Sequence, residues 1–318
     1  MFLDKIKSGA SGILTYGITP PKSETTAERI AEIAERTIAR LIPLDIDALI
    51  VYDVQDESAR TAEERPFPFL KAYDPFNFAR EYLQELKIPK IIYRPAGKFS
   101  AEELSDWLDH LHQHNFYPVF VGVPAPDFPV KVSLPEAYNI WSKHQATSVM
   151  GAVTIPERHE VLKDEDKRIL DKAACGVSYF ISQCVFDVEY AKKVVEDLCL
   201  TCREAQATPP TLIFTLTACG SAKTLHFMEW LGIHIPAPLK EELRHSDNML
   251  ERSVSVCLHI AEKLMDFCSR QCIPFGFNIE SVAIRKDEIE ASIYMVNHIA
   301  EMLKEKGLRD TAPVPSET

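Results

Sequence analysis

The sequence lacks several features that would place it in whole classes of protein. No apolar stretch of its 318 residues reaches the length that spans a bilayer. The first residues include an acidic side chain and only a short apolar run, so we expect no signal peptide and a cytoplasmic protein. Acidic residues outnumber basic ones by 47 to 35, and no basic stripe alternates with aromatic residues. We therefore expect neither nucleic acid nor an anionic membrane as a partner.

A disulfide framework and a complete metal motif are also missing, although the chain has eight cysteines. Cys199 and Cys202 have the CxxC spacing, but no second CxxC and no paired histidines accompany them. Cys268 and Cys272 are four residues apart in a helical pattern, where packing is the commoner role. A structural zinc site brings four ligands together. We therefore expect free thiols and no metal site.

The chain does contain a regular alternation of short apolar runs and longer amphipathic segments. The apolar runs cover residues 12–19, 47–54, 90–95, 117–123, 148–155, 178–185, 211–218 and 274–281. The helical segments cover residues 24–42, 75–87, 100–114, 133–144, 163–174, 187–206, 222–231, 247–271 and 286–304. Two helix starts are marked by a capping box at Ser100 and Glu103 and by Asp74 before a proline.

Eight strand and helix units favour a single (β/α)8 TIM-type barrel, because the strands are too apolar to face water on either side. The alternative is an open doubly wound sheet, but no glycine-rich phosphate loop follows the first strand. No interior linker is visible, so we expect one domain over residues 1–305. Residues 234–247 are expected to form a loop or short helix, and residues 306–318 a disordered tail.

Reactive groups in such a barrel gather at the carboxyl ends of the strands. The richest end is "YDVQDES", which contains Asp53, Asp56 and Glu57. A carboxyl group held there can have a raised pKa and act as a general acid, although the same pattern also fits a solvated loop. Gln183 interrupts an apolar strand, and a buried amide needs a hydrogen-bond partner such as a ligand. His159 follows strand five, where it could equally be a loop histidine or a helix-cap partner.

The order of these residues resembles that of the methylenetetrahydrofolate reductase family over most of the barrel. "IPERH", residues 155–159, is similar to the family's tyrosine-proline-glutamate-x-histidine element. "ISQCVFDVE", residues 181–189, is similar to its threonine-glutamine-x-x-phenylalanine-aspartate strand, and the double proline at residues 20–21 also matches. The family reduces methylenetetrahydrofolate to methyltetrahydrofolate with NAD(P)H and FAD. The resemblance therefore implies a folate ligand and these two cofactors.

The resemblance also implies roles for single residues. Gln183 would hydrogen-bond the pterin, and Phe227 would pack beside the folate or the nicotinamide. We add Glu280, at the end of the last strand, to the substrate site. The residues expected on the cofactor side are Lys172, which would meet the FAD phosphates, with His159, Glu157 and Arg94.

Two departures from the family pattern affect the chemistry. The glutamate that helps to open the methylene-bridged ring is replaced by Gly17, and the aspartate beside the flavin is replaced by Val123. We therefore expect weak or absent flavin binding and an acid moved to strand two, with Glu57 first and Asp56 and Asp53 behind it.

Three functions stay open at this point. The first is methylenetetrahydrofolate reduction by direct hydride transfer from the nicotinamide. The second is reduction of another pterin-like one-carbon substrate. The third is a catalytically silent folate-binding or partner subunit. A homo-oligomer also stays open.

Overall fold

The computed structural model describes residues 2–123, 128–144 and 148–310. Within them, parallel strands pair in chain order and close into an eight-stranded barrel, because β1 pairs with both β2 and β8. The strands are β1 (Ile13–Ile18), β2 (Ala48–Val51), β3 (Lys90–Pro95), β4 (Phe116–Val121), β5 (Met150–Thr154), β6 (Val177–Cys184), β7 (Thr211–Thr217) and β8 (Phe275–Glu280). The predicted (β/α)8 barrel is confirmed, and the open sheet is excluded.

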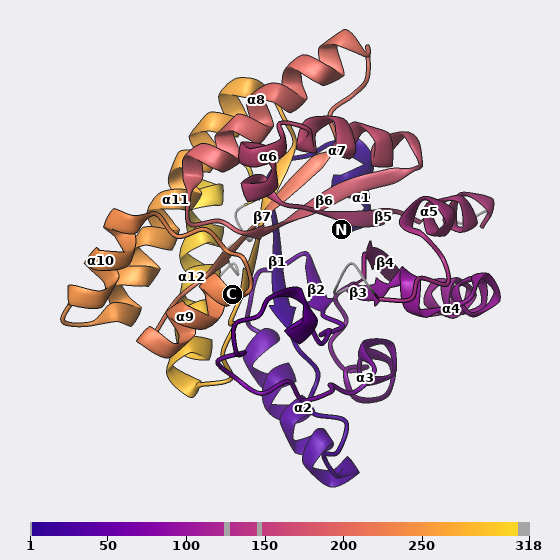
Figure 1. The fold of residues 1–318 in the computed structure, drawn as a ribbon, viewed down its shortest axis with the longest axis horizontal. Helices are drawn as coiled ribbons and strands as arrows, with labels where there is room; N and C mark the ends of the chain where they lie inside the picture. The colour runs from indigo at the N-terminus through magenta and orange to yellow at the C-terminus, as the bar shows by residue number, and fades with distance from the viewer. Residues whose placement is uncertain (1, 124–127, 145–147, 311–318) are drawn as a thin grey trace, which may run out of the picture.

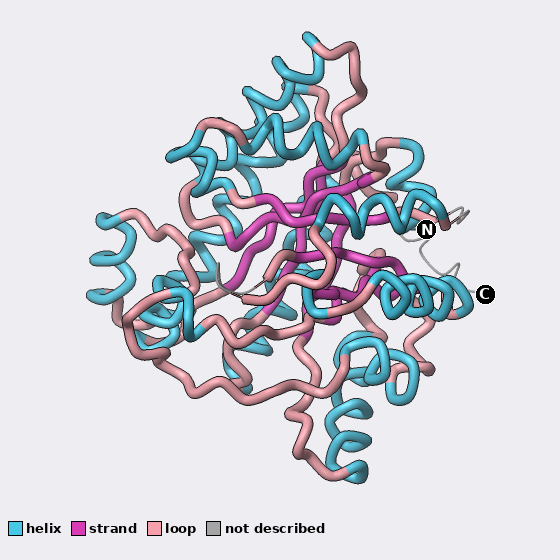
Figure 2. The backbone as a smooth tube through the Cα atoms, turned by 45° about the vertical axis from the view of Figure 1, so that its right-hand side comes forward, coloured by secondary structure: helices cyan, strands magenta, loops and turns pink. Residues whose placement is uncertain are grey.

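The helices surround the strands (Figures 1 and 2). They are α1 (Phe2–Ser8), α2 (Ala27–Leu41), α3 (Pro75–Tyr82), α4 (Ala101–Gln113), α5 (Leu134–Lys143), α6 (Pro156–Leu162), α7 (Glu165–Ala174), α8 (Val188–Glu204), α9 (Ala222–Trp230), α10 (Ala237–His245), α11 (Met249–Gln271) and α12 (Lys286–Glu305), with 3-10 turns η1 (Ser58–Arg60) and η2 (Ala96–Lys98). None of the described helices is long and apolar enough to cross a membrane.

The predicted helix starts are present. The Ser100 hydroxyl accepts the Glu103 backbone N–H at 3.2 Å, and the Glu103 carboxylate accepts the Ser100 N–H at 2.6 Å. Asp74 caps α3 by accepting the Asn77 N–H at 2.9 Å. Helix α10 forms within the segment expected to be a loop or short helix. Helices α1 and α6 were not predicted, because each has only seven residues and shows little periodicity.

Helix α1 closes the amino-terminal end of the barrel. Phe2 is fully buried, and its ring centroid lies 5.5 Å from that of Tyr117 and 5.4 Å from that of Tyr179. Ile50, Ile181 and the other inner aliphatic residues join the same cluster. Because this end is filled by apolar side chains, the polar interior lies at the carboxyl end.

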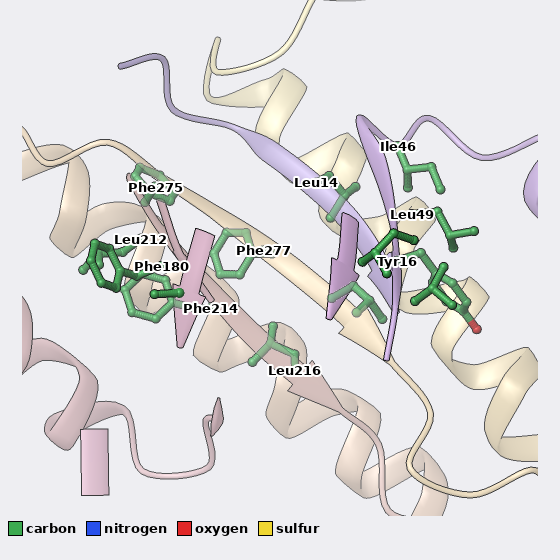
Figure 3. Close-up of a cluster of buried hydrophobic side chains, with 14 of the residues drawn as sticks. Leu14, Tyr16, Ile46, Leu49, Phe180, Leu212, Phe214, Leu216, Phe275 and Phe277 are labelled. Carbon is green, nitrogen blue, oxygen red and sulfur yellow. The ribbon is translucent and has the colours of Figure 1, made fainter. Parts of the chain in front are cut away.

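A second apolar layer packs the outside of the strands against the helices (Figure 3). Leu14, Leu49, Phe214 and Phe277 belong to it and are at most 2% exposed. All seven residues of β7 are buried, as expected for a parallel strand with the barrel interior on one face and helices on the other. Both faces of this strand are therefore packed.

Arg309 holds the last described residues against the base of the barrel. Its guanidinium lies 2.5 Å from the Asp47 carboxylate and 2.6 Å from the Asp45 carboxylate, and it donates to the Gly12 carbonyl at 2.9 Å. The side chain is only 5% exposed. Residues 306–310 of the expected tail thus belong to the folded domain, and residues 311–318 lie outside the described residues.

Replacing Arg309 should destabilise the barrel. We expect Arg309→Ala to lower the free energy of unfolding by about 2 to 3 kcal/mol, because the carboxylate of Asp47 keeps only Lys5 as a charged partner. The control is Lys306→Ala, since the Lys306 and Asp266 ion pair is solvent-exposed and should be worth about 1 kcal/mol or less. Urea unfolding measures both. Equal losses in the two variants would contradict the role given to Arg309.

Candidate active site

Tyr52 directly follows β2, and its side chain lies inside the barrel at the carboxyl end. Side chains alternate along a strand, so Tyr52 follows Ala48 and Ile50 on the inner face. Its ring lies 4.8 Å from that of Tyr93 in an edge-to-face arrangement. Tyr52 was not predicted as a site residue, although the two-residue period already places it beside the inner core.

Asn278 is the centre of a polar network in the same layer. Its side chain is fully buried. Its Oδ1 accepts the Thr15 hydroxyl at 3.1 Å, which orients the amide. Its Nδ2 then donates to the hydroxyls of Tyr52 at 2.8 Å and Thr215 at 3.3 Å, and to Glu280 Oε2 at 3.4 Å. The network thus links β1, β2, β7 and β8 around one carboxyl group.

Glu280 is that carboxyl group. The Tyr52 hydroxyl hydrogen-bonds to it, and the Cys184 thiol donates to its Oε1 at 3.4 Å. Part of its surface stays accessible at the open end of the barrel. Dense packing around it raises its pKa above the usual glutamate value, and the hydrogen bonds from Tyr52, Cys184 and Asn278 oppose this only in part.

Gly17 lies beside this pair. It is the register partner of Glu280 in the β1 and β8 pairing. A Cβ atom at position 17 would lie 2.7 Å from the ring of Tyr52 and 3.2 Å from the Cβ of Glu280. The space of a side chain at position 17 is therefore filled by Tyr52, and a carboxyl group is supplied by the neighbouring strand.

The predicted strand-two acids lie outside this network. Burial raises the pKa of Asp53 to about 6, partly opposed by nearby Arg94. Asp56 is exposed, and its pKa is lowered because its carboxylate accepts the Ser58 N–H at 3.0 Å. Glu57 is half-buried and precedes η1. Of Asp53 and Asp56, Asp53 is therefore the one whose environment suits a proton donor near neutral pH.

Gln183 sits at a bulge in β6. The β6 and β7 register shifts between Ile181 and Cys184, and the Ser182 hydroxyl fills the gap by accepting the Thr215 N–H at 2.9 Å. Gln183 Oε1 accepts the Cys184 N–H at 3.3 Å. The Nε2 atom of Gln183 has no acceptor among the described residues. Gln183 is half-buried and adjoins the thiol that contacts the Glu280 network.

Residues 52–74 form the long connection between β2 and α3, which we call the strap. It covers one side of the barrel. It leaves β2 and reaches α9, which follows β7, so it passes the carboxyl ends of β1 and β8 (Figure 1). Phe67 of the strap meets the ring of Phe227 at 5.2 Å, and the Trp230 indole donates to the Glu63 carbonyl at 3.1 Å. The Arg65 guanidinium lies over the Phe227 ring. Phe227 therefore anchors the strap to α9.

Three residues expected on the cofactor side are engaged within the protein. His159 is buried, with Nε2 donating to Asp197 at 2.9 Å and Nδ1 accepting the Glu165 N–H. Lys172 donates to the Val153 carbonyl at 2.9 Å, and burial lowers its pKa to about 8. The guanidinium of Arg94 pairs with Asp74, and its centre lies 4.6 Å from the rings of Phe99 and Trp107.

Glu157 is the fourth residue expected on the cofactor side. One of its carboxyl oxygens is buried and has no hydrogen-bond partner among the described residues, and burial raises the pKa of this carboxyl group to about 7. A carboxyl group does not suit a flavin pyrophosphate. At the end of β4, Val123 occupies the space beside Gly97, where a Cβ would lie 2.4 Å from it. Glu157 and Val123 therefore do not supply the cationic donors that a flavin pyrophosphate needs.

The eight cysteines all lie among the described residues and are free thiols. Burial raises the pKa of the Cys184, Cys202 and Cys268 thiols, so they are neutral at pH 7. Among the described residues, no group of three or more histidine, cysteine, aspartate or glutamate side chains is arranged to hold a metal ion.

Comparison with solved structures gives two weak likenesses and one strong one. A dihydropteroate synthase from Anaplasma phagocytophilum with bound 6-hydroxymethylpterin-monophosphate is 12% identical, with 92% of this chain and 99% of that chain covered and a TM-score of 0.45. A 2,3-dimethylmalate lyase is 13% identical, with coverage of 99% and 96% and a TM-score of 0.41. Neither likeness carries an inference about function.

The third comparison is much stronger. No protein-family model matches the sequence, and no curated protein matches it. An uncharacterized protein from Clostridium thermocellum, described as binding two copies of 5-methyl-5,6,7,8-tetrahydrofolic acid, is 42% identical. The match covers 94% of this chain and 98% of that chain, with a TM-score of 0.81. The chain therefore belongs to the same family as this methyltetrahydrofolate-binding protein.

Proposed function

We propose that this protein binds a reduced folate at the carboxyl end of its barrel and reduces methylenetetrahydrofolate to methyltetrahydrofolate with NAD(P)H. The observation that carries the folate part is the Clostridium thermocellum relative, which is 42% identical and binds 5-methyl-5,6,7,8-tetrahydrofolic acid. Methyltetrahydrofolate is also the product of the proposed reaction. A binding site for it is therefore a site that this reaction needs.

The polar groups at the open end of the barrel suit a pterin. Such a ring presents hydrogen-bond donors and acceptors along one edge, and the Gln183 amide offers both kinds of group. The adjoining Cys184 thiol contacts Glu280, so the end of β6 that carries the amide also contacts this carboxyl group. The strap above β1 and β8 limits the access of water to bound substrate.

Direct hydride transfer from the nicotinamide is the form of the reaction that we favour. This form is supported by the partners that His159, Lys172 and Arg94 each have within the protein, and by the apolar Val123 in place of the family's aspartate. The barrel's residues would then bind and orient the folate, exclude water and supply a proton.

A silent folate-binding subunit is the second candidate. The replacement of both family carboxylates, by Gly17 and Val123, favours it. Such a protein would bind methyltetrahydrofolate without consuming NAD(P)H. Reduction of another pterin-like one-carbon substrate would show the opposite behaviour, with NAD(P)H consumed only in the presence of that substrate.

Folate binding should depend on Gln183. We expect Gln183→Leu to raise the Kd for methyltetrahydrofolate about tenfold or more, because pterin groups left unpaired in a buried site cost about 1 to 3 kcal/mol. Isothermal titration calorimetry measures the Kd. Gln113→Leu, an exposed change on α4, is the matched control and should bind normally. An unchanged Kd in Gln183→Leu would show that this residue does not contribute to folate binding.

The absorbance spectrum of the purified protein tests the cofactor. We expect no flavin bands, together with NADH oxidation that requires methylenetetrahydrofolate. A colourless protein that binds folate but oxidises no NADH or NADPH would favour the silent subunit. Stoichiometric FAD in the spectrum would contradict direct hydride transfer and would require a flavin site formed by other residues.

A further inference from the structure

We propose that Glu280 is the proton donor of the reaction, so that the acid missing from strand one is supplied by strand eight. This inference rests on the proposed function. It differs from the expectation drawn from the sequence, which placed the acid on strand two and gave Glu280 a substrate-binding role.

Glu280 lies next to the position of the missing acid. Gly17 and Glu280 are register partners on neighbouring strands, and a Cβ at position 17 would approach the Cβ of Glu280 to 3.2 Å. A carboxyl group on Glu280 therefore occupies the region next to a side chain at position 17. The strand-two acid Asp53 instead follows the inward-facing Tyr52 and lies in the electrostatic environment of Arg94 and Asp74.

The groups around the Glu280 carboxyl group are neutral. The titratable groups that face Glu280 are the hydroxyls of Tyr16, Tyr52 and Tyr93 and the thiol of Cys184. All are neutral at pH 7, and no cation among the described residues contributes to the pKa of Glu280. Without a cation to stabilise the carboxylate, dense packing raises the pKa of this carboxyl group.

Hydrogen bonds orient the Glu280 carboxyl group. Tyr52, Cys184 and Asn278 come from three strands and hydrogen-bond to the Glu280 carboxyl group. These contacts hold the acid in one place without neutralising it by an ion pair. Tyr52 and Asn278 are therefore positioning residues for Glu280, and Gly17 is needed because a side chain there would displace the Tyr52 ring.

The proposed reaction transfers one proton and one hydride. The Glu280 proton moves to N10 of methylenetetrahydrofolate as the bond between N10 and the bridging carbon breaks, and N10 keeps the bonding electron pair. The bridging carbon, now doubly bonded to N5 as a cation, accepts a hydride from NAD(P)H and becomes a methyl group. NAD(P)H is oxidised to NAD(P)+, the folate is reduced, and Glu280 regains a proton from water.

The principal test compares Glu280→Gln with the wild type. We expect the rate of NAD(P)H-dependent reduction to fall by about 10² to 10⁴, with the Kd for methyltetrahydrofolate changed only a few-fold. In the wild type, kcat/KM should fall as pH rises through the raised pKa of Glu280, because the protonated form is active. This dependence should vanish in Glu280→Gln. The surface variant Glu290→Gln should keep both rate and pH profile.

Tyr52→Phe tests the positioning role. The Tyr52 hydrogen bond lowers the pKa of Glu280, so its removal should raise that pKa and move the fall in kcat/KM to higher pH. A uniform loss of rate with an unshifted pH profile would contradict this role.

Infrared spectroscopy gives a readout that does not depend on turnover. At pH 7 the wild type should show a protonated carboxyl band that is missing from Glu280→Gln, in addition to any bands from Asp53 and Glu157. An identical spectrum in the two proteins would overturn the proposal, even if Glu280→Gln folds poorly.

The remaining outcomes separate this inference from the proposed function. Normal turnover in Glu280→Gln with loss in Glu57→Gln would return the acid to strand two and overturn the inference alone. A wild type that binds methyltetrahydrofolate but reduces no methylenetetrahydrofolate would overturn the inference and the reductase, leaving folate binding intact. A wild type that does not bind folate would overturn the proposed function itself.

Discussion

The candidate site depends on the pairing of β1 with β8, which closes the barrel. This pairing brings Gly17 beside Glu280, although the two residues are at opposite ends of the chain. It also brings Thr15 against Asn278, whose amide then holds Tyr52 and Glu280. A shift of this register would separate the carboxyl group from the space beside Gly17 and remove the donors that orient it.

Neutral hydrogen-bond donors, rather than ion pairs, set the chemistry of this site. Several other buried charges in the protein are paired, as in the bidentate contact of Arg158 with Glu165 and the Arg309 contacts with Asp45 and Asp47. Glu280 has no such cation among the described residues. The difference lies in the partners, because a cation beside a carboxylate favours its charged form, whereas dense packing without a cation raises the pKa of the carboxyl group.

Phe227 fixes the position of the strap at the open end of the barrel. Phe227 packs with Phe67 and Trp230 and lies under the Arg65 guanidinium. These contacts hold the long β2 to α3 connection over the ends of β1 and β8. Long loops carry function most readily when such anchors limit their conformations, and the effect of Phe227 on folate would then act through the strap.

The sequence by itself determined the eight strands, most of the helices and the two capping signals, because these depend on local periodicity and on residues three or four apart. It also identified Gly17 as the unusual position and placed Gln183 and Glu280 at strand ends. The tertiary structure alone decided which groups meet. The register of β1 with β8, the β6 bulge and the strap join residues far apart in the chain. The neutral surroundings of Glu280 follow from these contacts, and the partners of His159, Lys172 and Arg94 likewise come from other elements of the fold, which no local pattern specifies.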